Sequence, residues 1–574
     1  MSDIPVSTAG VVFPARASEL VSADAIRASL IALLVASFAV IVLGVFRQAI
    51  GGDEYIFLTG IYRAANSEPV GLLQTAYVHL FAWLPLVEHD EIFQITLGRL
   101  IYVALWAGSL TLLYRLGRRL LDPLGALASV GLFAVFSYSI GNAASFRLDG
   151  LLLPVLLSIA LLLLKPSIGR VAAAGALSGL AVAISIKAVL WAPAFMGVLA
   201  VGLWCRQDRI RQIVAGGLAG IVTFAGIMLV HSRLISMDLA DIRTTVLEGG
   251  SNAGRYMFLN GFVPQWDFLR YAVLANPGTW ILLAIGLWLV LAGLQQPQSR
   301  RNSLILMLLA LPILSVTFYT NAFPYAYLVL LPTTCLLAGH AVSKFMASGE
   351  QMKRIFVLGC LGVAAMPLVH FAWEYRNDGQ GRQKQIVTAV HRLFPEPVPY
   401  IDMSGLIASF PRPTLSITWF VLDAYRRAGV PVLSDYIHRD KPPLLIVNTK
   451  VLQVWDEEGL ASLDSRLLPQ DEETIRATYA HYWDQIYLAG RQWRDLAAGE
   501  SRSFDIVVPG DHTLIARDSV IVDGRTYRPW ATIRLEEGPH RLQTTSAEPD
   551  PRILWGTRLK PLEDLPPSLA DVEQ

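Results

Sequence analysis

Long uncharged runs of apolar residues follow one another along the chain up to about residue 375. The first run, residues 29–46, has 18 positions without a charge, and a helix of that length nearly spans a hydrocarbon core of about 30 Å. The pattern predicts a polytopic α-helical membrane protein of about eleven spans. The apolar runs lie near residues 29–50, 93–114, 124–143, 149–164, 171–186, 189–204, 212–231, 270–294, 303–320, 324–341 and 354–374.

The density of charge changes near residue 375. Residues 375–574 carry 23 Lys or Arg and 28 Asp or Glu, which leaves 42 charged residues for the longer part before them. This change marks a boundary between a transmembrane domain (29–374), which follows an N-terminal segment (1–28), and a soluble C-terminal part. The net charge of +1 argues against a nucleic-acid partner.

The soluble part divides again by its pattern. Residues 375–500 combine strand-like runs with helical patterns near 415–428 and 471–497, which predicts an α/β region. Residues 501–560 alternate apolar and polar positions between Pro-Gly, Asp-Gly and Glu-Gly turns, which predicts a small β-sandwich-like unit. Its aromatic residues Tyr527 and Trp530 either pack in a core or stack on a sugar. Residues 561–574 are expected to be a loose end.

Lys and Arg residues indicate the orientation of the spans. With the N-terminus inside, the cytoplasmic loops are basic, whereas the first outer loop (51–92) is acidic. This asymmetry places a second outer loop (232–269) and the C-terminal part on the same outer side, which is the periplasm for a bacterial inner membrane. Residues 71–85 are apolar and aromatic but too short to span, so they predict one or two helices lying at the membrane interface.

The few charges among the apolar runs fall at predicted turns. Residues 171–204 contain one charge, Lys187, at their middle. A lysine at the centre of a span costs roughly 2.5–3.5 kcal/mol, so the stretch is predicted to turn there. Arg147 and Asp149 mark a similar turn within 124–164, and Asp53 and Glu54 directly follow the first span. The topology therefore predicts that these five residues share the outer face.

This combination of charges has a chemical meaning. Carboxylates can deprotonate a hydroxyl or hold a divalent cation, and Lys and Arg can bind a phosphate. The catalytic candidates, which are also the ligands of any metal ion, are Asp53, Glu54 and Asp149. The candidates for binding a donor phosphate are Lys187, Arg147, Arg63, His231, Arg233 and Arg243. The alternative for each residue is an ion pair or a solvated loop end.

Three motifs in this order resemble the GT-C membrane glycosyltransferases, notably the protein O-mannosyltransferases and the lipid A aminoarabinose transferases. They are Asp53-Glu54, Arg147-Leu148-Asp149 and Ile184-Ser185-Ile186-Lys187, and the resemblance covers residues 30–340. It implies that Asp53 is the catalytic base or lies beside it, and that Lys187 binds the donor phosphate. Relatives often have a Lys/Gly-Pro-Pro stretch where this chain has LQTAY at 73–77, so a basic contact from that segment is not expected.

The expected function is that of an inverting hexosyl- or pentosyltransferase. The sugar would leave a polyprenyl-phosphate donor for a hydroxyl of an envelope glycan, lipid or protein, and membrane lipids would surround the enzyme. The sequence requires no cofactor but leaves room for a divalent cation. One alternative is a transporter or flippase of lipid-linked sugars, which would place charges at mid-membrane in repeated halves. Another is a non-catalytic envelope-assembly subunit, which would leave the Asp53-Glu54 pair unexplained.

Overall fold

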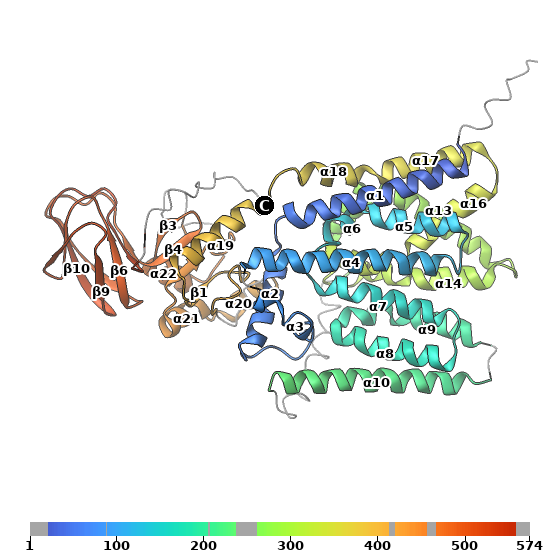
Figure 1. The fold of residues 1–574 in the computed structure, drawn as a ribbon, viewed down its shortest axis with the longest axis horizontal. Coiled ribbons are helices and arrows are strands. Elements are labelled where there is room, and N and C mark those ends of the chain that lie inside the picture. The colour runs from blue at the N-terminus through green and yellow to red at the C-terminus, as the bar shows by residue number, and fades with distance from the viewer. Residues whose placement is uncertain are drawn as a thin grey trace, which may run out of the picture. The chain divides into compact units, whose positions relative to one another are not determined.

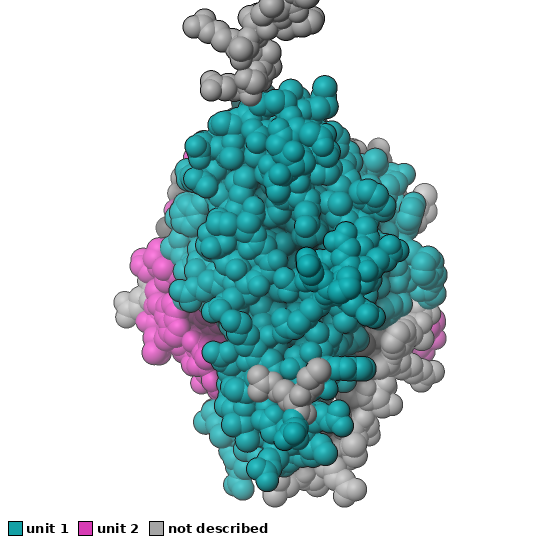
Figure 2. Space-filling model, turned by 90° about the vertical axis from the view of Figure 1, so that its right-hand side faces the viewer, with its two compact units in different colours: residues 1–46, 71–77, 99–377 teal, residues 47–70, 78–98, 378–574 magenta. Residues whose placement is uncertain are grey.

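The chain forms two compact units in the computed structural model (Figures 1 and 2). Unit 1 comprises residues 1–46, 71–77 and 99–377, and unit 2 comprises 47–70, 78–98 and 378–574. The first outer loop is thus divided, because residues 71–77 belong to unit 1 and the residues on either side belong to unit 2. The structure describes residues 21–87, 89–204, 207–236, 261–412, 419–455, 466–557 and 559.

Each of the eleven apolar runs forms helix, many of them parallel to one another in Figure 1. The helices from these runs are α1 (Ala23–Arg47), α4 (Glu91–Gly117), α5 (Pro123–Val135), α6 (Ser137–Asn142), α7 (Leu148–Leu163), α8 (Ile168–Ile184), η3 (Ile186–Trp191), α9 (Ala192–Leu203), α10 (Arg209–Leu234), α12 (Trp266–Ala275), α13 (Pro277–Leu294), α14 (Arg300–Ala310), η4 (Leu311–Thr317), η5 (Pro324–Ala326), α15 (Tyr327–Leu330), α16 (Cys335–Ala347), α17 (Gln351–Ala364) and α18 (Met366–Glu374).

Helix length confirms a multi-pass membrane protein. Among the described residues, seven helices are long and apolar enough to cross a membrane, and the bent pair Pro324–Leu330 with Cys335–Ala347 makes an eighth. The remaining three runs are the shorter apolar helices α5, α7 and α8. The predicted total of eleven crossings stays a prediction.

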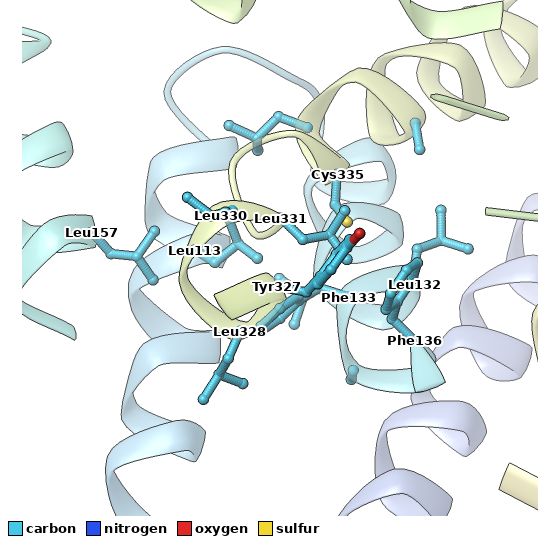
Figure 3. Packing of buried hydrophobic residues seen from close by; sticks show 14 of the residues in the cluster. Leu113, Leu132, Phe133, Phe136, Leu157, Tyr327, Leu328, Leu330, Leu331 and Cys335 are labelled. Atoms are coloured by element: carbon cyan, nitrogen blue, oxygen red, sulfur yellow. The ribbon is translucent and has the colours of Figure 1, made fainter. Parts of the chain in front are cut away.

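The core of unit 1 extends through its helices, and one part of it lies where α5, α6 and the bent span meet. Phe133 and Phe136 at the end of α5 pack with Tyr327 of α15 (Figure 3), and the rings of Phe136 and Tyr327 stack with centroids 6.4 Å apart. Around them lie leucines of α4, α7 and α15 with Cys335. This packing holds the bent span between its neighbours.

Unit 2 combines the first outer loop with the C-terminal part. The loop contributes α2 (Gly52–Ala65), α3 (Tyr77–Leu80) and η2 (Leu84–Leu86), so the short helices predicted for 71–85 form, and their depth in a membrane stays a prediction. The C-terminal elements are α19 (Gly381–Leu393), β1 (Tyr400–Ile401), α20 (Trp419–Ala428), α21 (Val432–Asp440), β2 (Leu444–Ile446), α22 (Pro469–Thr478), β3 (Tyr479–Trp483), β4 (Ile486–Gln492), β5 (Ser501–Ile506), β6 (Gly510–Ile515), β7 (Val520–Val522), β8 (Arg525–Tyr527), β9 (Thr532–Leu535), β10 (Gly538–Thr544) and β11 (Arg552–Trp555).

The strands confirm an α/β and β-rich C-terminal part. Among the described residues they form a seven-stranded sheet, in the order β1-β2-β4-β11-β6-β9 with β3 beside β4, and a four-stranded sheet, β5-β10-β7-β8. Strands from both sides of residue 500 share the larger sheet. The helix predicted over 471–497 is wrong beyond Thr478, where β3 and β4 form a hairpin instead. Aromatic and β-branched residues favour strands, and in this hairpin Tyr479 and Ile486 are buried.

Candidate active site

The first part of the site is the break between α8 and η3. Helix α8 ends at Ile184, and Ser185 has an extended backbone with φ −157° and ψ 137°. The Ser185 hydroxyl accepts a hydrogen bond from the backbone N–H of Lys187 at 3.4 Å, which caps the start of η3. The chain therefore turns beside Lys187, as its position in the middle of a long apolar stretch predicts.

The second part is the start of α7. Arg147 is the N-cap residue of this helix, with an extended backbone, and Asp149 lies in the first turn. The Asp149 residue is 3% exposed. A carboxylate in the first turn interacts favourably with the helix dipole, but burial at this depth also requires a cationic partner.

Charged side chains from the start of α7 and from the break between α8 and η3 contact each other. Lys187 Nζ lies 2.7 Å from Asp149 Oδ1, and Arg147 Nε lies 3.8 Å from Asp149 Oδ2. One carboxylate therefore stands between two cations, which leaves the three side chains with a formal charge of +1. The structure thus brings together three of the residues that the sequence pattern places at one face.

Tyr325 completes this cluster and was not among the residues predicted from the sequence. Its ring centroid lies 3.7 Å from Arg147 Cζ and 4.3 Å from Lys187 Nζ, so both cations contact the aromatic face. Tyr325 belongs to η5, in the span that bends by 57°. Pro332, inside this apolar run and between the two helices of the bent pair, is the signal that could have indicated the bend.

The remaining predicted phosphate ligands of unit 1 lie elsewhere. His231, in the last turn of α10, is 1% exposed, and its Nε2 lies 2.8 Å from the Thr75 hydroxyl. Arg233 is an exposed residue in the same turn. Arg243 lies outside the described residues.

The acidic pair of unit 2 lies in the first turn of α2. Glu54 is 2% exposed, and its carboxylate accepts a hydrogen bond from the Gly51 N–H at 2.9 Å. In return the Glu54 N–H donates to the Gly51 carbonyl at 2.9 Å. Glu54 therefore caps the helix, as a residue at this position of a capping box does. Asp53 is half-buried one residue earlier.

Arg63 ends the same helix. Its Nη2 donates to the Arg412 carbonyl at 3.2 Å, and its Nε lies 3.7 Å from Glu68 Oε2. Burial, followed by the nearby positive charge of Arg412, lowers the pKa of the Arg63 guanidinium. This contact fixes the end of α2 to the C-terminal part of the same unit.

A second contact with the C-terminal part involves the loop that follows β1. The Asp402 carboxylate accepts from the Gly405 N–H at 2.9 Å and lies 3.6 Å from Arg412 Nη2. Gly405 has φ +83°, and a Cβ there would lie 2.4 Å from the Thr59 hydroxyl of α2. Only a glycine allows this approach, so the loop is shaped to fit the helix that carries Asp53. The sequence gives no local signal for a contact across so many residues.

The structure also bears on metal binding. Among the described residues, no group of three or more His, Cys, Asp or Glu side chains is placed to hold a metal ion. Both Asp149 oxygens face cations in the cluster described above. The metal ligands considered from the sequence therefore stay a prediction.

No known protein family matches the chain, and no curated protein matches it by sequence. Solved structures do resemble it. The oligosaccharyltransferase of Archaeoglobus fulgidus in the apo form has 10% identity and a TM-score of 0.51, over 90% of this chain and 94% of that chain. ArnT from Cupriavidus metallidurans bound to undecaprenyl phosphate has 14% identity and a TM-score of 0.49, over 75% and 95%.

A third similar structure is the arabinosyltransferase EmbB from Mycobacterium smegmatis, with 11% identity and a TM-score of 0.37, over 92% of this chain and 64% of that chain. At such identities a structural likeness establishes the fold alone. The likeness to the oligosaccharyltransferase, with a TM-score above 0.5, shows that this chain shares the fold of that protein.

Proposed function

We propose that this protein is a membrane glycosyltransferase that takes a sugar from a polyprenyl-phosphate donor. The observation that supports the proposal most is the cluster of Lys187, Arg147, Asp149 and Tyr325 at two adjoining helix breaks. Two cations with one carboxylate leave a positive charge, which suits a phosphate whose lipid tail lies in the bilayer. A solved complex of the oligosaccharyltransferase with a dolichol-phosphate supports a lipid-linked donor for this fold.

In the proposed reaction, Asp53 accepts the proton of an acceptor hydroxyl. The oxygen then bonds to the anomeric carbon of the sugar from the side opposite the phosphate, which inverts the anomeric configuration. The bond between that carbon and the phosphate oxygen breaks, and its electron pair stays on the lipid phosphate. Lys187 and Arg147 stabilise this leaving group. Glu54 and Asp149 act indirectly, by holding the start of α2 and the two cations.

The acceptor is a hydroxyl of an envelope glycan, lipid or protein on the periplasmic face of a bacterial inner membrane. The basic loops on the opposite side support this orientation. A phosphatase that is active only outside the cytoplasm, fused after Trp373, is expected to be active. Activity of a cytoplasm-only reporter at the same position would contradict the orientation.

Titration of undecaprenyl phosphate against purified variants tests the donor site. Lys187→Ala and Lys187→Met are expected to bind more weakly than wild type, and Lys187→Arg to recover part of the loss because it keeps the charge. Lys353→Ala is a matched control, since Lys353 pairs with Glu350 on an exposed surface at 2.6 Å. Unchanged binding by all three Lys187 variants would overturn the assignment of the phosphate site.

A further inference from the structure

Residues 71–77 form a short segment of unit 1 flanked on both sides by residues of unit 2. We call this segment the strap. Gln74 lies at its middle with φ +61°, in the left-handed region that residues other than Gly, Asn and Asp rarely adopt. Such strain persists when the surrounding structure holds it, and it often occurs where a side chain has a functional task.

The Gln74 side chain contacts the turn that carries Lys187. Its Oε1 accepts a hydrogen bond from the Ser185 hydroxyl at 3.2 Å, and the same Ser185 oxygen accepts from the Lys187 N–H at 3.4 Å. A serine hydroxyl has one proton and two lone pairs. Donating that proton to Gln74 directs a lone pair toward the Lys187 backbone. Gln74 therefore orients the cap of η3.

Two further contacts hold the strap in place. The Thr75 hydroxyl donates to the Gly71 carbonyl, and its oxygen lies 2.8 Å from His231 Nε2, within hydrogen-bond distance. Leu72 is fully buried against Ala183 of α8 and Met228 of α10. The strap is thereby fixed to the ends of α8 and α10, with Gln74 beside Ser185.

We propose that the strap positions the phosphate-binding cluster, with Gln74 as the positioning residue and the Thr75–His231 pair as its anchor. The proposal rests on the proposed function for its ligand, a lipid phosphate. Gln74 reaches Lys187 through Ser185, and Lys187 in turn bonds Asp149 at 2.7 Å. The strained backbone of Gln74 places its side-chain oxygen beside Ser185, where it accepts the hydroxyl proton of the cap. His231, a predicted phosphate ligand, acts here by anchoring the strap.

Gln74→Gly separates this role from a general structural one. Glycine adopts φ +61° without strain, so the melting temperature of the variant is expected to equal or exceed that of wild type. Loss of one hydrogen bond that orders the site is expected to weaken binding of undecaprenyl phosphate roughly three- to tenfold. Asp495→Gly is the matched control, because exposed Asp495 has φ +50° and lies in unit 2. This control should leave binding unchanged.

Hydrogen exchange of the backbone amides of residues 185–191, without ligand, is the second measurement. Gln74→Gly is expected to exchange faster there than wild type and Asp495→Gly. Equal exchange in all three proteins would overturn the role of the strap, and so would wild-type binding by Gln74→Gly. If wild type itself binds no undecaprenyl phosphate, the proposed function fails, and faster exchange in Gln74→Gly would still support the positioning role.

Discussion

The two charged regions of this protein differ in how their side chains find partners. In unit 1 the charges at the helix breaks are few, and Arg147, Asp149 and Lys187 satisfy one another within a single cluster. In unit 2, Glu54 caps its own helix α2 and Arg63 contacts the distant C-terminal part. Arg63 bonds a carbonyl 349 positions away.

The difference has a physical cause. An unpaired charge among apolar helices costs so much that the nearest charge of opposite sign becomes its partner. A charge in a polar loop has water and many other groups as alternatives, so its partner depends on how distant segments pack. A scarce charge among apolar helices therefore has a more predictable partner than a charge in a polar loop.

Asp53→Asn is expected to have the largest effect, on the rate of sugar transfer. Removing a general base costs roughly 10²- to 10⁴-fold in rate, while the near-isosteric side chain leaves the fold intact. Glu54→Gln is the matched comparison, because glutamine also serves in a capping box, and its rate should stay close to wild type. Comparable losses in both variants, measured as release of lipid phosphate, would mean that Glu54 takes part in the chemistry.

Asp149→Leu is expected to destabilise unit 1 by about 3–5 kcal/mol, because it leaves the partly buried Lys187 beside Arg147 without a carboxylate. The double variant Asp149→Leu/Lys187→Met removes both charges and should recover much of that stability, though not donor binding. Thermal unfolding of both proteins in detergent measures the effect. If the double variant is less stable than Asp149→Leu, Lys187 stabilises the fold through contacts other than its ion pair with Asp149.

The smallest expected effect is a dependence on pH in unit 2. Its Glu91 carboxylate accepts from the Ser409 hydroxyl at 2.6 Å and bonds His391 Nε2 at 3.0 Å. The bond to Glu91 raises the pKa of the His391 imidazole, with a smaller contribution from Asp90. A raised pKa in the folded state means that the stabilisation is complete below the unfolded value of about 6.5 and is lost as the pH rises through the folded value.

His391→Gln should flatten this dependence. Thermal unfolding of wild type and His391→Gln, compared from about pH 6 upward, reports the difference in slope. Equal slopes would show that the imidazole does not gain a proton on folding. Ser409→Ala removes a neutral contact of the same carboxylate and should leave the slope in place.

The hydrophobic pattern predicts much of the fold. All eleven apolar runs are helical because apolar positions and the need to satisfy backbone groups leave few alternatives. The pattern also predicts both helix breaks, since Lys187 and Arg147 could not stay in the middle of one long span. It was wrong at residues 479–492, where a strand hairpin replaces the expected helix. A short amphipathic run is compatible with either structure until its neighbours are known.

The sequence predicted the residues of the cluster only where a charged residue lies at a turn between two apolar runs. Tyr325 was missed because nothing in the sequence relates an aromatic residue after a proline to cations about 140 to 180 positions earlier. The capping bond of Glu54 was not predicted because a capping carboxylate and a catalytic one look alike in sequence, and its catalytic role stays a prediction. The contacts of Arg412 and Gly405 with α2 depend on how the C-terminal part packs within unit 2.

Mass spectrometry of lipid-linked sugars tests the central claim most directly. The purified protein would be incubated in detergent with polyprenyl-phosphate sugars from its native membranes and with envelope acceptors from a deletion strain. If the protein transfers sugar as proposed, one lipid-linked sugar disappears, bare polyprenyl phosphate appears in equal amount, and the acceptor gains the sugar with inverted configuration. Asp53→Asn is the control for this turnover. Lipid-linked sugars that all remain intact would contradict the account and favour a protein that moves or holds them.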